Sequence, residues 1–213
     1  YGHIGGVGVA LGAVNSGQEL IIHAEYDAGD VMDAIAAHRV RRLFLVPAAI
    51  GLLLQHPKAA TADFSSIETL SYGASPIPLP LLQQAVARIG CGFVQVYGMT
   101  ETCGIITSIS GDFFVDKPAS AGPPMPNFEA KCVDDDGNTV APGEVGELWV
   151  RGPQIMVGYL NNEEATRNTL LEDGWLRTGD VAVIDSHGDV FVVDRAKELI
   201  KYKGYQVAPA ELE

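Results

Sequence analysis

Four cations stand close together near the end of a chain that is otherwise acidic. Arg195, Lys197, Lys201 and Lys203 fall within nine residues, and Gly204 follows the last of them. On an extended backbone, Lys201 and Lys203 would point to the same side, and the glycine permits a tight turn or the close approach of a ligand. Cations beside such a turn can bind a nucleotide or another phosphate ligand. A solvated surface would explain the same charges without a ligand.

A second candidate site is the segment YGMTE, residues 97–101. Tyr97 could stack on a base, Thr100 could donate a hydrogen bond to a phosphate oxygen, and Glu101 could hold Mg²⁺ beside it. The alternative is purely structural. In that case a strand ends at a glycine turn formed by Gly98, Thr100 caps a helix, and Glu101 lies in its first turn.

A third candidate is Asp180, in the segment Thr178-Gly179-Asp180. We expect Asp180 to stand just before a strand, where an aspartate often serves only the turn. The functional alternative is a carboxylate that accepts hydrogen bonds from two ribose hydroxyls, as in dinucleotide sites.

Alternating strands and helices are predicted to position these residues. Helices are expected at Ile4–Ser16, which we predict to be buried, and then from a cap at Asp27 to His38, at Pro47–Gln55 and at Leu79–Ile89. Short strands are expected at Glu19–His23, Arg42–Val46, Glu68–Tyr72 and Gly92–Tyr97. This alternation predicts a parallel sheet with helices on its faces. Ligands of such sheets bind at the carboxyl ends of the strands, where residues 72–75 and 97–101 would lie.

From about Ser110 the pattern changes to prolines and closely spaced strands. One hairpin is expected from Phe128–Val133 and Gly146–Arg151 around an Asp-Asp-Asp-Gly turn, and a second from Val181–Ile184 and Val190–Val193. A short helix is expected between them at Asn161–Leu171. This half therefore predicts a small antiparallel β subdomain that could form a barrel.

Composition narrows the class of protein. With 213 residues, 47% of them apolar and 19% charged, the chain is globular. The net charge is 14 − 27 = −13, which argues against nucleic-acid partners and anionic membranes but not against a local anion site. There is no apolar run of about 18 residues and hence no expected membrane span. Three scattered cysteines without a CxxC pair indicate neither a metal site nor a disulfide framework, but reduced, core-filling thiols in a cytoplasmic protein.

Five segments together resemble the adenylate-forming enzymes, the family of acyl- and aryl-CoA synthetases, firefly luciferase and peptide-synthetase adenylation domains. In chain order they read YGASP, QVYGMTE, GELWVRGPQIMVGYLN, DGWLRTGD and DRAKELIKYKGYQVAPAELE. The wording of the last segment is similar to the branch of fatty-acyl-CoA synthetases, 4-coumarate–CoA ligases and luciferases. The resemblance implies ATP, Mg²⁺ and coenzyme A as ligands, together with a carboxylic acid that is a fatty or an aryl acid. A homodimer is the assembly to test.

The resemblance also implies a role for individual residues. Gly73, Ala74 and Ser75 would line the adenine edge, and Gln95, Tyr97 and Gly98 would complete the base and acyl pocket. Thr100 would contact the α-phosphate and Glu101 the magnesium ion, while Asp180 and Arg195 would hold the ribose. Lys197 would be the hinge of a C-terminal lid. Lys201 and Gln206 would act in the thioester-forming half-reaction, with Lys203 and Gly204 approaching coenzyme A. His3 would border the acyl pocket, although a packed, hydrogen-bonded histidine remains the alternative.

The resemblance divides the chain into three parts. Residues 1–110 would belong to the α/β part of a large N-terminal domain, residues 111–194 to a β-barrel subdomain, and residues 195–213 to the hinge and the start of the C-terminal domain. The family's phosphate loop and its C-terminal catalytic lysine would lie outside these residues, so we expect a fragment without ligase activity of its own. The alternatives are a luciferase-like oxygenase, a synthetase that loads a carrier protein, and a non-catalytic nucleotide-binding module.

Overall fold

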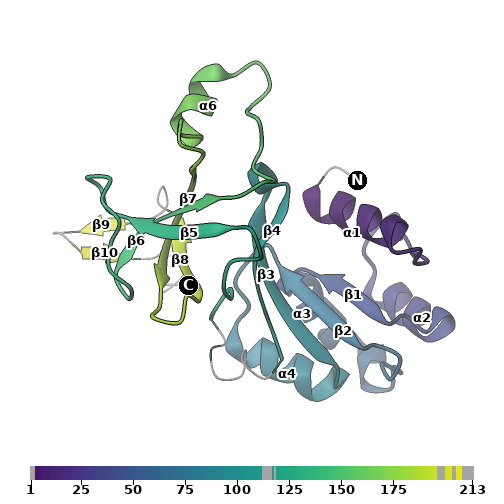
Figure 1. Cartoon of the computed structure of the whole chain (residues 1–213). Helices are drawn as coiled ribbons and strands as arrows, with labels where there is room; N and C mark the ends of the chain where they lie inside the picture. Colours follow the sequence, from purple (N-terminus) through teal and green to yellow (C-terminus); the bar gives the residue numbers. More distant parts are fainter. Residues whose placement is uncertain (1–2, 112–116, 118, 196–199, 203–204, 208–213) are drawn as a thin grey trace. The chain divides into compact units, whose positions relative to one another are not determined.

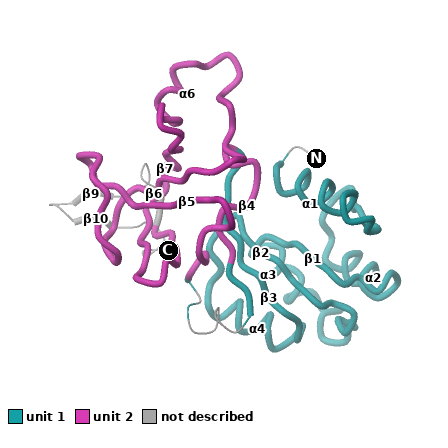
Figure 2. The backbone as a smooth tube through the Cα atoms, viewed as in Figure 1, with its two compact units in different colours: residues 1–100, 109–119 teal, residues 101–108, 120–213 magenta. Residues whose placement is uncertain are grey.

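The computed structural model describes residues 3–111, 117, 119–195, 200–202 and 205–207. The chain forms two compact units (Figure 2). The first contains residues 1–100 and 109–119, and the second contains residues 101–108 and 120–213. The predicted division at residues 110 and 194 stays a prediction.

The first unit is an α/β structure with parallel strands, as predicted (Figure 1). Its elements are α1 (Ile4–Asn15), α2 (Ala28–His38), β1 (Arg42–Leu45), α3 (Pro47–Gln55), η1 (Pro57–Ala60), β2 (Thr69–Gly73), α4 (Leu79–Ile89) and β3 (Gly92–Met99). Strand β2 pairs in parallel with both β1 and β3. Asp27 caps α2 as expected, because its Oδ1 accepts a hydrogen bond of 2.9 Å from the backbone N–H of Asp30.

One face of these three strands is buried under helices α2, α3 and α4. Strand register aligns Leu45 with Tyr72 and Tyr72 with Gln95, so these side chains share that face. The core is built from the strand residues of this face, from one stripe of each helix, and from Ala59, Phe64 and Ile67 between α3 and β2. Its largest fully buried members are Met32, Ile35, Ile50, Leu53, Leu70, Tyr72, Leu82 and Phe93.

Helix α1 forms as expected, but the prediction that it is buried is wrong. Only Ala13 is buried, whereas Leu11 and Val14 are 65% and 80% exposed. The helix is apolar on every side, so its sequence does not indicate which face packs. It contacts the sheet near its start, where a Cβ on Gly5 would lie 3.6 Å from the ring of Phe44. No element among the described residues covers the remainder.

The predicted strand Glu19–His23 is also wrong. These residues form irregular, mostly exposed chain between α1 and α2. A strand requires a neighbouring backbone to pair with its N–H and C=O groups. Within the described part of the chain no strand pairs with this segment, and the apolar pattern alone could not reveal that.

The second unit contains the predicted antiparallel sheet, with the strand order β5-β6-β7-β8 (Figure 1). Its elements are β5 (Glu129–Val133), β6 (Val145–Arg151), α6 (Glu163–Thr169), β7 (Leu176–Ile184) and β8 (Val190–Arg195). Aspartates close both turns: Asp134 Oδ1 accepts from the N–H groups of Asp136 and Asn138, and Asp185 Oδ1 from those of His187 and Asp189. Both predicted hairpins are confirmed, although β7 begins five residues earlier than predicted, at Leu176.

The two faces of this sheet differ in character. Cys132, Leu148, Val150 and Leu176 alternate onto the buried face. The other face carries tryptophans and charges, with Lys131 Nζ lying 5.1 Å from the ring centre of Trp149 and 4.3 Å from that of Trp175. Arg151 and Arg177 each stack on one of these rings and pair with Glu129 and Glu147, respectively. We call Lys131, Trp149, Arg151, Trp175 and Arg177 the cation–aromatic cluster.

Four elements complete the described structure. Strand β4 (Gly104–Ser110), which the sequence pattern did not predict, follows the 3₁₀ turn η2 (Thr100–Thr102) and is the fourth strand of the sheet ordered β1-β2-β3-β4. Strands β9 (Ile200–Tyr202) and β10 (Tyr205–Val207) pair antiparallel. The backbone is extended at Lys201, as expected, whereas Lys203 and Gly204 lie outside the described residues.

The cysteines and the helices test two further expectations from the sequence, namely core-filling thiols and no membrane span. The three cysteines are free; Cys132 is buried as expected, but Cys103 is exposed and does not fill the core. Burial raises the pKa of the Cys132 thiol to about 11. None of the helices in the described residues has the length and apolar character needed to cross a membrane.

Candidate functional site

The first candidate residues, Gly73, Ala74 and Ser75, lie at the carboxyl end of β2, where the backbone conformation fixes their positions. A Cβ on Gly73 would lie 2.3 Å from the carbonyl oxygen of Val96 on β3, so only glycine fits there. The next residue, Ala74, has φ of 71°, in the left-handed region that non-glycine residues seldom adopt. The chain therefore leaves the sheet sharply and places Ser75 on the surface.

Tyr72 and Gln95 form the polar pair beside this turn. The Tyr72 hydroxyl donates a hydrogen bond of 3.0 Å to Oε1 of Gln95, its register partner on β3. The Tyr72 ring is fully buried and makes an edge contact with Phe93 at 6.4 Å between ring centres. Burial raises the pKa of Tyr72 to about 12, so the hydroxyl stays protonated. Because Oε1 of Gln95 accepts from Tyr72, its amide nitrogen is the group able to donate to another partner.

Strand β3 carries the next candidates to the same edge of the sheet. Tyr97 and Gly98 both lie inside β3, which extends to Met99, so Gly98 does not end the strand as predicted. Tyr97 is partly exposed and makes an interaction of its own. Thr100 is exposed at the start of η2. The carboxyl ends of β2 and β3 thus hold both predicted groups of the first unit, as expected for a parallel sheet.

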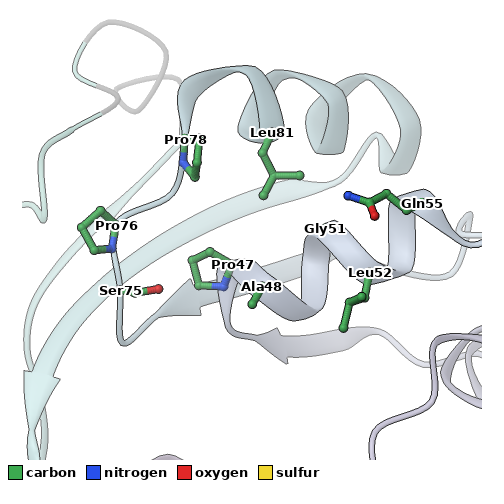
Figure 3. Close-up of a pocket in the computed structure, with 9 residues that line it drawn as sticks. All are labelled: Pro47, Ala48, Gly51, Leu52, Gln55, Ser75, Pro76, Pro78 and Leu81. Carbon is green, nitrogen blue, oxygen red and sulfur yellow. The ribbon is translucent and has the colours of Figure 1, made fainter. Parts of the chain in front are cut away.

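An open apolar groove of about 480 Å³ lies beside Ser75, along α3 and next to the start of α4 (Figure 3). Figure 3 shows Gln55 and Ser75 at its rim, and these are its polar side chains. The remaining lining residues are Pro47, Ala48, Gly51, Leu52, Pro76, Pro78 and Leu81. The sequence pattern does not predict this groove, because the groove depends on how two helices pack.

Glu101 is held from two directions within the second unit. Its carboxylate Oε1 accepts a hydrogen bond of 2.7 Å from the hydroxyl of Tyr159, and its backbone carbonyl accepts one of 2.8 Å from the N–H of Met156. The pKa of Tyr159 is raised, first by burial and then by this bond to Glu101. The phenol therefore donates and the carboxylate accepts.

The donor set around Glu101 fits a magnesium ion that is bound mainly by a nucleotide. The described residues contain no cluster of three histidine, cysteine or acidic side chains that could hold a metal ion. A single carboxylate suffices for Mg²⁺, which keeps several waters and shares its remaining positions with substrate phosphates. The hydroxyl of the adjacent Thr100 is of the type that contacts such phosphates.

Asp180 lies inside strand β7 and not before it, so the predicted position is wrong. Only 6% of the residue is exposed, and its backbone N–H donates to Thr178 Oγ1 at 3.1 Å. Thr178 in turn donates to the carbonyl of Leu148 at 2.7 Å. Strand pairing places Asp180 opposite Arg195 of β8. The two residues expected to share one ligand group are thus neighbours in the sheet, although their sequence separation did not indicate this.

The C-terminal candidates are described in part. Lys201 of β9 and Gln206 of β10 are cross-strand partners, so the backbone brings these two predicted residues together. Lys197, Lys203 and Gly204 lie outside the described residues.

His3 is exposed and caps helix α1, with its Nδ1 accepting a hydrogen bond of 3.1 Å from the N–H of Gly5. It is hydrogen-bonded as the structural alternative expects, but it is not packed against the core. Its role in an acyl pocket stays a prediction.

Tyr159 was missed as a functional candidate. It belongs to the GYLN end of a segment that carried the family resemblance, yet its partner Glu101 lies 58 residues earlier. No local pattern joins the two, and only the loop after β6 brings them together.

Comparison with known proteins identifies the family of the chain. The family model described as AMP-binding enzyme matches residues 1–160. The chain belongs to this family. It is 37% identical over 215 residues to 4-coumarate–CoA ligase-like 6 of Arabidopsis thaliana, with 99% of this chain and 38% of that protein aligned. It is also 37% identical over 212 residues to indoleacetate–CoA ligase of Aromatoleum aromaticum, covering 99% of this chain and 41% of that protein.

The chain is also similar in fold to a solved structure of a CoA synthetase. O-succinylbenzoate coenzyme A synthetase from Bacillus subtilis, in complex with ATP and magnesium ion, superposes with a TM-score of 0.90 at 35% identity. The alignment covers 99% of this chain and 43% of that chain. The α/β and antiparallel architecture of this family is therefore shown here, and the chain spans about two fifths of the length of the relatives that it matches.

Proposed function

We propose that this chain is part of an ATP-dependent carboxylic acid–CoA ligase that makes an acyl-adenylate and then an acyl-CoA thioester. The observation that carries the proposal is the arrangement at the end of β3, where Thr100 is followed by Glu101, whose carboxylate is fixed by Tyr159. The similarity to proteins named as CoA ligases supports the same reaction class. The assignment of individual residues to ligands follows from the family resemblance.

In the first half-reaction, a carboxylate oxygen of the acid attacks the α-phosphorus of ATP. The bond from that phosphorus to the pyrophosphate oxygen breaks, which leaves a mixed anhydride and pyrophosphate. The protein positions the two reactants and stabilises the spreading charge. We assign Thr100 to the α-phosphate and Glu101 to the bound metal, with Gly73, Ala74, Ser75, Gln95, Tyr97 and Gly98 around the base and acyl group. Bound Mg²⁺ supplies the charge neutralisation on the phosphates.

In the second half-reaction, the deprotonated thiol of coenzyme A attacks the acyl carbon, the bond from that carbon to the phosphate oxygen breaks, and AMP leaves with the electron pair of that bond. Lys201 and Gln206 are assigned to this step because they form a cross-strand pair in the segment that the resemblance gives to the lid. Asp180 and Arg195, which are partners in the β7–β8 ladder, are assigned to the ribose. Exclusion of water protects the anhydride until the thiol arrives.

The acid is proposed to be an aryl carboxylic acid in preference to a fatty acid. The names of the relatives mention 4-coumarate, indoleacetate and O-succinylbenzoate, each of which contains an aromatic ring. An acid panel that includes fatty acids of several lengths decides between the two classes.

The experiment is pyrophosphate release by the full-length enzyme with this panel of acids, with and without coenzyme A. We expect release with an aryl acid and consumption of the adenylate only when coenzyme A is added. Adenylate that accumulates in the presence of coenzyme A would indicate a carrier-loading or oxygenase enzyme. No release with any acid would indicate a non-catalytic nucleotide-binding module. Cell fractionation and light scattering test the proposed cytoplasmic location and homodimer.

A further inference from the structure

The loop between β6 and α6, residues 152–162, is bound to the segment that carries Glu101. Three hydrogen bonds make this connection within the second unit: Tyr159 hydroxyl to Glu101 Oε1 at 2.7 Å, Met156 N–H to Glu101 carbonyl at 2.8 Å, and Gln154 Nε2 to Ile105 carbonyl at 3.1 Å. Two of the three involve Glu101. The loop thus holds both the backbone and the side chain of the residue to which we assign the metal.

Tyr159 is itself fixed by the helix that follows the loop. Its backbone N–H donates to Thr166 Oγ1 at 2.9 Å, and the Thr166 hydroxyl donates to the carbonyl of Asn162 at 2.9 Å. Asn162 caps α6, with its Oδ1 accepting from the N–H of Ala165 at 3.0 Å. Because the backbone of Tyr159 is already fixed, its side chain loses little conformational entropy when the phenol binds the carboxylate.

We propose that Tyr159 is a positioning residue that holds the Glu101 carboxylate for the metal–nucleotide complex. This inference rests on the proposed function, in which Glu101 is the metal ligand. The bond from Tyr159 occupies Oε1, and among the described residues no protein group is bonded to Oε2, which can therefore face a cation. Groups that orient a metal ligand in this way typically change metal affinity when they are removed.

The chemistry of the phenol suits this role. A lysine or arginine at position 159 would also orient the carboxylate, but its positive charge would compete with the metal ion. A neutral hydroxyl restricts the side-chain torsions of Glu101 and leaves the charge of the carboxylate for the cation. A purely structural bond would have no such consequence for metal binding, so metal dependence separates the two roles.

The decisive variant is Tyr159→Phe in the full-length enzyme, which keeps the ring and removes the hydroxyl. ATP binding is measured by calorimetry in a Mg²⁺ titration without the carboxylic acid, so that no turnover occurs. We expect the affinity in the presence of Mg²⁺ to fall about threefold to tenfold, and the affinity with EDTA to stay unchanged. In steady-state assays the Mg²⁺ concentration for half-maximal pyrophosphate release should rise by the same factor, with the KM for the acid unchanged.

Two further comparisons control for loss of packing. Tyr26→Phe removes another tyrosine hydroxyl bond, the one of 2.6 Å to the Ala49 carbonyl in the first unit, and should leave the Mg²⁺ dependence unchanged. Thr166→Val removes the anchor of Tyr159 and should weaken Mg²⁺-dependent binding in the same direction, whereas Thr166→Ser keeps the hydroxyl and should not. The threonine pair tests the proposal even if Tyr159→Phe fails to fold.

The variant Glu101→Gln tests the metal assignment of Glu101 separately from the positioning role of Tyr159. If Glu101→Gln leaves the Mg²⁺ dependence unchanged, the metal assignment itself is wrong. If Glu101→Gln changes it but a folded Tyr159→Phe does not, the metal role stands and the positioning role of Tyr159 is overturned. Tighter Mg²⁺-dependent binding by Tyr159→Phe would overturn it as well.

Discussion

The two units position their candidate residues by different means. At the end of β2 the first unit uses its backbone: Gly73 touches β3 so closely that no Cβ fits, and Ala74 adopts a left-handed conformation. The second unit uses side-chain hydrogen bonds, in which Tyr159 holds Glu101 and Thr166 holds Tyr159. A glycine packed against the next strand accepts no side chain, whereas a side-chain bond can be removed one group at a time. The two regions should therefore respond differently to mutation.

The largest effect is expected from Gly73→Ala. The added Cβ would meet the Val96 carbonyl at 2.3 Å, and because that atom belongs to the backbone of a central strand, the sheet must shift. We expect a loss of about 2–3 kcal/mol in the free energy of unfolding, measured by urea denaturation.

The matched control is Gly12→Ala in helix α1, where an added Cβ meets nothing within 4 Å. There the same substitution should stabilise by about 0.5–1 kcal/mol, because alanine favours the helix. Equal effects at the two positions would contradict the claim that β2 and β3 approach too closely for a side chain.

An alkaline pH dependence is the second test of the first unit. The pKa of Tyr72 is raised to about 12 in the folded protein, so the fold favours the protonated phenol. Its contribution is complete below about pH 10, where the unfolded phenol ionises, and is lost as the pH rises toward 12. At about 1.4 kcal/mol per pKa unit, the loss approaches about 2–3 kcal/mol.

Tyr72→Phe isolates that contribution. Its unfolding free energy should be lower by about 1 kcal/mol at neutral pH, because Gln95 loses its donor, and should decline less steeply above about pH 10 than that of the parent. Parallel curves for the two proteins would show that Tyr72 is not the group responsible.

A smaller effect is expected in the second unit from Lys131→Met. The variant keeps the apolar stem of the side chain but removes the cation that lies between Trp149 and Trp175. We expect a loss of about 0.5–1 kcal/mol in the free energy of unfolding. Arg167→Met is the control, because the ion pair of Arg167 with Glu163 on α6 is exposed and its loss should change stability by no more than a few tenths of a kcal/mol.

The smallest effect is expected from Ala74→Gly. Glycine would relieve the left-handed strain at φ of 71°, but it also increases the freedom of the unfolded chain, and the two effects nearly cancel. We expect a change below about 0.5 kcal/mol. A loss greater than 1 kcal/mol would mean that the methyl group of Ala74, and not its backbone, matters at this turn.

Much of the fold could be predicted because its signals are local. The helix spacing at Leu79–Ile89, the cap at Asp27 and the aspartate-rich turns depend on residues a few positions apart, and the structure confirms each of them. The segments of residues 72–75 and 97–101 were also placed correctly near the carboxyl ends of β2 and β3, although β3 extends past Gly98 to Met99. The assignment of each residue to a ligand stays a prediction.

The errors occurred where a residue depends on a distant partner. Glu19–His23 has the composition of a strand but no neighbour among the described residues, and α1 is apolar on all sides but buries only Ala13. Asp180 was expected just before a strand, but β7 begins at Leu176 and continues through Gly179, whose φ is 73°. In each case strand pairing or burial determined the structure, and neither can be predicted from the local sequence pattern.

By itself the sequence determined the alternation of elements, the two strand-end segments and the family that these segments resemble. Tertiary structure alone decided which side chains meet: Tyr72 with Gln95, Lys131 with two tryptophans, and Tyr159 with Glu101. The physical reason is one of range. Propensity, capping and turn chemistry act over a few residues, whereas a hydrogen bond across 58 residues exists only after the intervening chain has folded.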